Sequence, residues 1–290
     1  MITIENEFLS VSIEETGAQL KRIFSKKTQT EYLWQGDPAY WTGRAYNLFP
    51  IIGRLHEGKY DLYGKTYEMQ PHGLIRRRML KGEKHSVSSC VFTFVSDEET
   101  LASYPYDFVY SIEYSLKGAC ILMTVSVLNK SKQTMYFAIG GHPGFSIPFD
   151  GGAFEDYAVF FPKATSLKWH KFSENILMSG EVEDYPLMEN KLSLRHSLFG
   201  LDAIVLEGSG GVAEIARAGG TRKIVVNYPS MDFVGVWHKP KSDAPFICIE
   251  PWSTLPARDG VREDFAKKSD FLSARPNEKH QTVWSIEVKE

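Results

Sequence analysis

Short segments with a strand-like pattern recur along almost the whole chain, and they constrain the fold more than any other feature. In these segments apolar and polar residues alternate, or β-branched and aromatic residues gather. They predict strands at residues 2–4, 8–13, 19–23, 66–69, 88–95, 108–116, 119–129, 157–161, 192–194, 203–206, 212–216, 223–228, 233–237 and 281–288. Turn residues separate many of them, and Lys117-Gly118 predicts a hairpin between two of the segments.

Helical periodicity is scarce by comparison. We predict only short helices, at residues 37–41 and at 262–273, where Phe265, Phe271 and Leu272 share a face. Many short strands with almost no crossover helices predict a largely antiparallel all-β fold, a sandwich or a barrel. We found no repeat of fixed period, no low-complexity segment and no linker rich in Pro, Gly or Ser, so we expect one domain over residues 1–290.

Charge and cysteine content narrow the class of protein. The net charge of -3 and the pI near 6.3 give no electrostatic reason to expect a nucleic acid or an anionic membrane as partner. No apolar stretch reaches the length of a bilayer span. The cysteines Cys90, Cys120 and Cys248 are odd in number and widely spaced, which predicts a reducing compartment. The first residues lack a signal-peptide pattern, so we expect a cytoplasmic protein. For the oligomeric state we expect either a monomer or a homodimer.

Two apolar runs end in a residue that can transfer protons. The run at 136–139 is followed by two glycines and by His142, which lies between a glycine and a proline and is therefore held at a strand end. The run at 246–249 ends in Glu250. A histidine in such a place is more commonly structural, but a carboxylate at the end of a buried run is costly to desolvate unless it has a partner or a task. Together His142 and Glu250 suggest an acid/base pair.

Other polar residues have both a structural and a functional interpretation. Arg54 caps a sheet edge or binds a polar ligand, and His72 repeats the placement of a histidine between proline and glycine. Residues 76–78 are three arginines, which form a solvated run or an anion site. Asp202 precedes an apolar strand, as a turn residue or as an acceptor for hydroxyl groups. Trp237 ends a predicted strand, and it is either a core residue or an aromatic face on which a ligand stacks.

Several reaction classes lack their motifs in this sequence. We found no Gly-x-Ser-x-Gly elbow, no phosphate-binding loop of the Walker type and no Gly-x-Gly-x-x-Gly after a strand. Cys-x-x-Cys spacing is also missing, which argues against a thiolate zinc site. These reaction classes are therefore set aside.

Five short motifs, in this order along the chain, resemble the aldose 1-epimerase (galactose mutarotase) superfamily, and most closely its LacX-like branch. They are Gly53-Arg54, His72-Gly73, Gly141-His142-Pro143-Gly144-Phe145, Leu201-Asp202-Ala203 and Ile249-Glu250-Pro251-Trp252. Trp41 and the segment 48–54 also take the form found in that branch, and the resemblance covers nearly the full length. It implies a β-supersandwich and the interconversion of the α and β anomers of a free aldohexose without a metal or an organic cofactor.

The resemblance also implies roles for individual residues. Glu250 would be the general base that takes the proton from the anomeric hydroxyl, and His142 the general acid that protonates the ring oxygen. His72 would hydrogen-bond the sugar near the ring oxygen, Asp202 would accept from sugar hydroxyls, and Arg54 would help to orient the ring. We expect His142 and Glu250 to face each other across a pocket sized for a pyranose. Burial would raise the pKa of Glu250, whereas a nearby cation such as Arg54 would lower it.

The substrate stays open between three hypotheses. The residues on either side of His142 differ from the Asn and the Tyr-Phe-Asn-Leu of better-characterised mutarotases. The stretch 72–76 is more similar to the hexose-6-phosphate 1-epimerase branch, in which Arg76, with Arg77 or Arg78, would hold the phosphate. The alternatives to a free hexose are therefore a hexose 6-phosphate as substrate, or a sugar-binding or sensor protein that has lost turnover.

Overall fold

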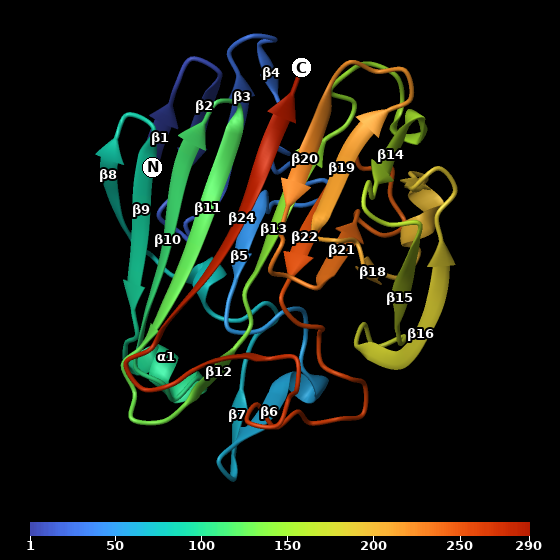
Figure 1. Ribbon diagram of the computed structural model, residues 1–290. Coiled ribbons are helices and arrows are strands. Elements are labelled where there is room, and N and C mark those ends of the chain that lie inside the picture. Colours follow the sequence, from blue (N-terminus) through green and yellow to red (C-terminus); the bar gives the residue numbers. More distant parts are fainter.

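The computed structural model describes residues 1–290, and two large antiparallel sheets dominate it, one behind the other in the view of Figure 1. The first sheet has nine strands, in the order β17 (Lys191–Ser193), β14 (Tyr157–Phe160), β19 (Val212–Arg217), β20 (Lys223–Asn227), β24 (Lys279–Lys289), β11 (Cys120–Asn129), β10 (Phe108–Lys117), β9 (Ser89–Val95) and β8 (Lys81–Ser86). The second has seven, in the order β16 (Met178–Pro186), β15 (Ser166–Phe172), β18 (Ile204–Glu207), β21 (Phe233–Trp237), β22 (Phe246–Trp252), β13 (Gly140–Ser146) and β5 (Ala45–Leu48).

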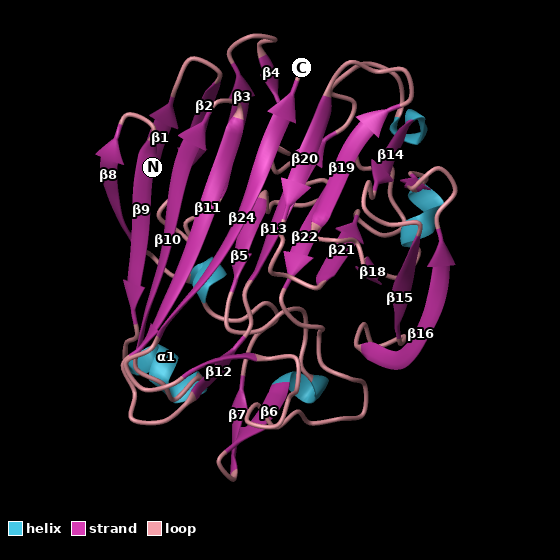
Figure 2. Ribbon diagram, in the orientation of Figure 1, coloured by secondary structure: helices cyan, strands magenta, loops and turns pink.

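Smaller elements flank these sheets. The remaining strands are β1 (Ile2–Glu5), β2 (Leu9–Ile13), β3 (Leu20–Ser25) and β4 (Thr30–Glu31) in one sheet, the hairpin of β6 (Lys59–Leu62) and β7 (Lys65–Glu68), and the pair of β12 (Met135–Phe137) and β23 (Leu272–Ala274). Helical structure is limited to α1 (Glu98–Ser103) and the 3₁₀ turns His56–Gly58, Ile75–Arg77, Phe154–Asp156 and His196–Phe199, as Figure 2 shows. None of these helices is long and apolar enough to cross a membrane. The predicted antiparallel all-β fold is confirmed.

Alternation along the strands decides which side chains reach the core. Ile112 of β10 and Val125 of β11 belong to the same buried cluster as Val234 of β21 and Ile249 of β22, so one core joins the two large sheets. Successive side chains of a strand point to opposite faces of its sheet. Glu250, which follows Ile249, therefore points to the face of the seven-stranded sheet that lies away from this core.

The predicted strands and hairpin agree with the structure, whereas the predicted helices are wrong. Each predicted strand segment overlaps an observed strand, and β10 and β11 pair with Lys117 opposite Cys120. Residues 37–41 form a turn instead of a helix. In the segment 262–273 the backbone pairs with β6, because the Asp61 N–H donates to Glu263 O and the Phe265 N–H donates to Asp61 O. Pairing between segments far apart in the chain thus overrides the weak helical periodicity.

The structure also corrects the expected places of the two proton-transfer residues. His142 lies within β13 and Glu250 within β22, whereas we expected both at strand ends. The glycines before His142 do not end a strand. A Cβ on Gly140 would lie 2.9 Å from Pro251 O, and one on Gly141 would lie 2.5 Å from the Trp284 ring. These glycines therefore permit close approach of neighbouring groups.

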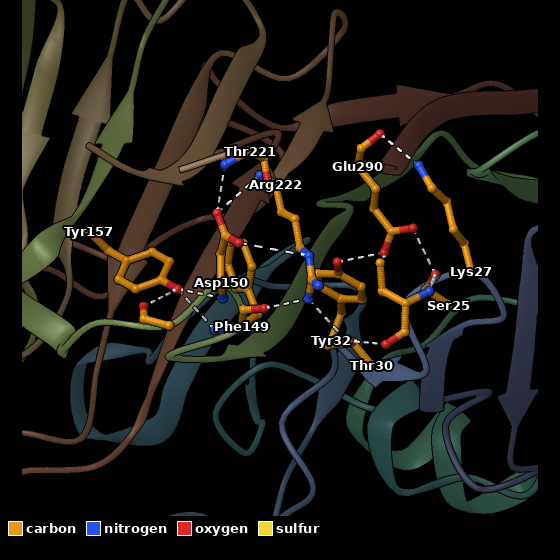
Figure 3. Close-up of polar contacts among 12 residues, drawn as sticks. Ser25, Lys27, Thr30, Tyr32, Phe149, Asp150, Tyr157, Thr221, Arg222 and Glu290 are labelled. Carbon is orange, nitrogen blue, oxygen red and sulfur yellow. Dashed lines mark hydrogen bonds and ion pairs between the residues drawn. The ribbon is translucent and has the colours of Figure 1, made fainter. Parts of the chain in front are cut away.

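A polar cluster around Arg222 ties together three separate segments (Figure 3). One guanidinium nitrogen of Arg222 donates to Thr30 Oγ1 at 3.2 Å and to Phe149 O at 3.0 Å. Its Nε lies 3.8 Å from Asp150, whose other carboxylate oxygen accepts the Arg222 backbone N–H. A single side chain thus joins the start of β20 to β4 and to the segment after β13.

Glu290 makes a second set of contacts beside this cluster, also drawn in Figure 3. Its carboxylate accepts hydrogen bonds from Tyr32 Oη at 2.7 Å and from Ser25 Oγ at 2.9 Å. Its carbonyl oxygen accepts from Lys27 Nζ at 3.2 Å. The end of β24 is thereby attached to the four-stranded sheet.

Replacement of Arg222 by Met should lower the free energy of unfolding by about 1–3 kcal/mol, because Phe149 O and Thr30 Oγ1 lose a charged donor. Urea denaturation followed by circular dichroism measures this loss. Arg275→Met is the matched control, because its ion pair with Glu278 is exposed, and such pairs contribute little. Equal stability of the two variants would contradict the role given to the Arg222 cluster.

Candidate active site

A cavity of about 350 Å³ lies over the face of the seven-stranded sheet that points away from the core. Ligand pockets in proteins have volumes of roughly 300–1,000 Å³, so this cavity is suited to a small molecule. The structure brings all seven of the predicted site residues to its wall. They are Arg54, His72, Arg76, His142, Asp202, Trp237 and Glu250.

His142 and Glu250 lie side by side on two neighbouring strands. β13 and β22 pair antiparallel with Gly140 opposite Trp252 and Gly144 opposite Cys248, which sets His142 opposite Glu250. His142 Nε2 is 3.3 Å from Glu250 Oε1, and the two side chains are 9% and 2% exposed. The expected geometry, with the pair facing each other across a pocket, is corrected: the two groups touch and border the cavity together.

Burial shifts the pKa values of the two groups in opposite directions. Burial, and then the negative charge of Asp202, raises the pKa of Glu250 well above its usual range. Burial also lowers the pKa of His142, and the positive charge of Arg76 lowers it further. The direction of the Glu250 shift, which the sequence left open, is therefore upward, and burial is its main cause. Both shifts favour the uncharged forms of the two groups, a protonated carboxyl and a neutral imidazole. They also make the carboxylate, when it is ionised, a stronger base and the imidazolium, when it is protonated, a stronger acid.

Aromatic rings surround the imidazole of His142. The Trp41 ring stacks on it with centroids 4.8 Å apart and an interplanar angle of 27°. Trp237 and His72 lie at steep angles to it, with centroids at 5.4 and 5.5 Å, and Tyr46 lies at 6.1 Å. Sequence reasoning included Trp41 only in the family resemblance and missed Tyr46. The local sequence around an aromatic residue carries no signal of which side chain it will contact.

His72 is held on a tight turn with a defined donor. Its φ is +62°, and Gly73 follows at +73°, where a Cβ would lie only 2.3 Å from Phe49 O. The Gly53 N–H donates to His72 Nδ1 at 3.3 Å, so the proton of the neutral ring is on Nε2. Burial, and then the neighbouring His142, lowers the pKa of His72 well below its usual value. His72 is therefore a neutral ring that offers an N–H to a ligand.

Asp202 and Arg54 complete the polar part of the wall. One carboxylate oxygen of Asp202 accepts the Ala203 N–H at 2.8 Å, which is the turn role considered from the sequence. Its other oxygen has no protein partner, so it is available to a ligand hydroxyl. Burial raises the pKa of Asp202, and the positive charge of Arg54 opposes that shift. Arg54 itself is exposed.

The three consecutive arginines divide between two cavities. Arg76 borders the candidate site, and its guanidinium carbon lies 4.8 Å from the Tyr46 ring centroid. Arg77 and Arg78 line a separate cavity, and Arg78 forms an ion pair with Glu99. Arg76 and Arg77 lie in the 3₁₀ turn Ile75–Arg77 and Arg78 follows it with extended backbone, so the three side chains point in different directions. The proposed phosphate site at 76–78 is therefore reduced to Arg76.

Two further features escaped the sequence reasoning. Lys239, two residues after Trp237, adds a third cation to the cavity wall, after Arg54 and Arg76. Cys248 lies with His142 and Glu250 in a group whose potential metal-ligand atoms are all within 4.8 Å of one another. Such a group has no spacing signal in the sequence, because strand pairing alone brings its members together.

Comparison with known proteins places the chain in a family. The family model described as aldose 1-epimerase matches residues 1–281. Protein LacX of Lactococcus lactis is 34% identical over 268 residues, which are 88% of each chain. The solved structure of a galactose mutarotase-like protein from Lactobacillus casei is 29% identical and superposes with a TM-score of 0.93 over 99% of both chains. A galactose mutarotase related enzyme from Lactobacillus acidophilus is 30% identical, with a TM-score of 0.92 over 100% of this chain and 97% of that one. The chain therefore belongs to the aldose 1-epimerase family.

Proposed function

We propose that this protein is an aldose 1-epimerase that interconverts the α and β anomers of an aldohexose by acid/base ring opening. One observation carries the proposal: a buried imidazole and a buried carboxyl group lie 3.3 Å apart at the wall of a cavity that fits a small molecule. Family membership supports the same reaction class.

Ring opening of a hemiacetal needs one proton removed and another delivered. A proton shift from the Glu250 carboxyl to His142 Nε2, across their 3.3 Å contact, gives the reactive ion pair. Glu250 then takes the proton of the anomeric hydroxyl, His142 gives its proton to the ring oxygen, and the C1–O5 bond breaks to leave an aldehyde. Rotation about C1–C2 and the reverse steps close the ring as the other anomer. The two oxygens are bonded to the same carbon, so an acid and a base that lie side by side suit them better than a pair on opposite walls. Each proton transfer contributes roughly 10²–10⁴ in rate.

The other wall residues are assigned to sugar binding. His72 donates from Nε2 to the ring oxygen region, and the free oxygen of Asp202 accepts from a hydroxyl. Arg54 donates to hydroxyls through its planar guanidinium. Trp237 offers an aromatic face to the apolar side of the pyranose. No metal or organic cofactor is needed for this chemistry.

An anomerisation assay across free hexoses tests this function directly. Freshly dissolved α-D-glucose and α-D-galactose are followed by polarimetry or proton NMR, with and without the protein. We expect the approach to anomeric equilibrium to accelerate in proportion to protein concentration for at least one sugar. Binding of a hexose without any acceleration would instead identify a sugar-binding or sensor protein.

A second candidate function is favoured by one observation. Arg76 and Lys239 both border the cavity, and neither forms an ion pair with a carboxylate there. Two cations without partners suit the phosphate of a hexose 6-phosphate, to which arginine donates in a bidentate manner. The acid/base step at C1 would be the same.

Arg76→Ala separates these two substrate classes. If Arg76 binds phosphate, the KM for a hexose 6-phosphate should rise about 10- to 100-fold, because a charged hydrogen bond contributes roughly 1.5–3 kcal/mol. The KM for the free hexose should change far less. Arg77→Ala is the matched control, because Arg77 lines the other cavity. Equal effects of Arg76→Ala on both sugars would exclude the phosphate role.

A further inference from the structure

Cys248 lies beside the proposed catalytic pair without a role in the reaction. It is two residues before Glu250 on β22, so both side chains point to the same face of the sheet. It stands opposite Gly144 of β13, two positions from His142. The side chain is fully buried and contributes no surface to the cavity wall.

The arrangement of the three side chains matches the geometry of a metal site. Zinc bonds of about 2.0–2.3 Å at tetrahedral angles separate the ligand atoms by roughly 3.3–3.7 Å. His142 Nε2 and Glu250 Oε1 are already 3.3 Å apart. The thiol sulfur completes a group in which no ligand atoms are more than 4.8 Å apart, so a shift of about 1 Å brings all three within bonding distance of one ion.

We propose that His142, Cys248 and Glu250 form a binding site for one zinc-like divalent cation, and that the bound ion blocks turnover of the sugar. Imidazole nitrogen, thiolate sulfur and carboxylate oxygen are the three donor types that zinc accepts, and three protein ligands leave a fourth position open to the cavity. The ion reaches them through the cavity, since His142 and Glu250 border it.

Charge balance supports this site. A divalent cation with one thiolate and one carboxylate is neutral overall, which lowers the cost of holding charge in a buried place. Burial favours the protonated forms of both Cys248 and Glu250, so metal binding displaces the S–H proton and the carboxyl proton to solvent. Gly144 leaves room above the sulfur, because a Cβ there would lie 3.3 Å from Cys248 Sγ.

Inhibition follows from the identity of the ligands, and this part rests on the proposed function. The ion occupies the lone pairs of Glu250 and His142 that the reaction needs for proton transfer. Zinc added to the enzyme should therefore slow anomerisation, and EDTA should restore the rate.

Cobalt(II) is the probe for binding, because a thiolate ligand gives it an intense charge-transfer absorption in the near ultraviolet. We expect this band in the wild-type protein and in Cys90→Ser/Cys120→Ser, where Cys248 is the only thiol. It should be lost in Cys248→Ala. In that variant the metal-free activity should persist, while the zinc concentration for half inhibition rises at least ~10-fold. Circular dichroism checks folding, and Cys248→Ser serves as a second variant.

Absence of the band from the wild-type protein, or an unchanged band in Cys248→Ala and Cys248→Ser, would overturn the metal site. The two proposals fail separately. A band that depends on Cys248 in a protein inactive on every sugar would refute the epimerase function alone. An active enzyme without the band would refute the metal site alone.

Discussion

Glu250→Gln should reduce kcat for anomer interconversion about 10²–10⁴-fold, the usual contribution of a general base. The amide has the size and shape of the carboxyl group but cannot take the proton of the anomeric hydroxyl. Folding should be retained. Glu250 is almost completely buried, burial favours its uncharged carboxyl form, and the amide that replaces it is also uncharged. The variant should therefore bind the sugar, while the two anomers interconvert at the uncatalysed rate.

Polarimetry of a pure anomer, extrapolated to zero buffer catalysis, measures this loss. Glu113→Gln is the matched control, since Glu113 is an exposed strand residue of the nine-stranded sheet. It should leave kcat unchanged. A Glu250→Gln enzyme with wild-type kcat and normal thermal stability would remove the base from the mechanism.

His142→Asn should cause a loss of similar size, about 10²–10⁴-fold in kcat, because no other group at the 3.3 Å contact can protonate the ring oxygen. Asn keeps a polar group at this place but has no proton to give near neutral pH. The surrounding rings of Trp41 and Trp237 lose their packing partner, so some stability will also be lost.

Thermal denaturation separates the two effects, since activity is measured well below the midpoint. His85→Asn, at an exposed position on β8, is the control for loss of an imidazole. The double variant His142→Asn/Glu250→Gln should be no slower than the slower single variant, because residues that act as a unit are not additive. A multiplicative loss in the double variant would mean that the two residues act independently.

Much of the fold was predictable because its signal is local. Alternation over a few residues identified the strands, and Lys117-Gly118 identified a hairpin that the structure confirms. The helix predicted at 262–273 failed because its backbone pairs with β6, and Phe265 stacks on Tyr60 with centroids 3.7 Å apart. A contact between residues so far apart in the chain leaves no periodic trace in either segment.

For the candidate site, too, one part was predictable from the sequence and another was not. Motif order along the chain collected five of the residues that line the cavity, while Arg76 came from the arginine run and Trp237 from the end of a predicted strand. Their relative placement was not predictable. The contact of Trp41 with His142, the separation of Arg76 from Arg77 and the group of Cys248 with Glu250 all depend on strand pairing and loop packing.

The sequence by itself determined the β architecture and named the residues to which we assign proton transfer and hydrogen bonding. Only the tertiary structure decided that His142 and Glu250 touch and that burial raises the pKa of the carboxyl group. The physical reason is range. Alternation and turn chemistry act over a few bonds, whereas desolvation and Coulomb interactions depend on distances that exist only after the strands have paired.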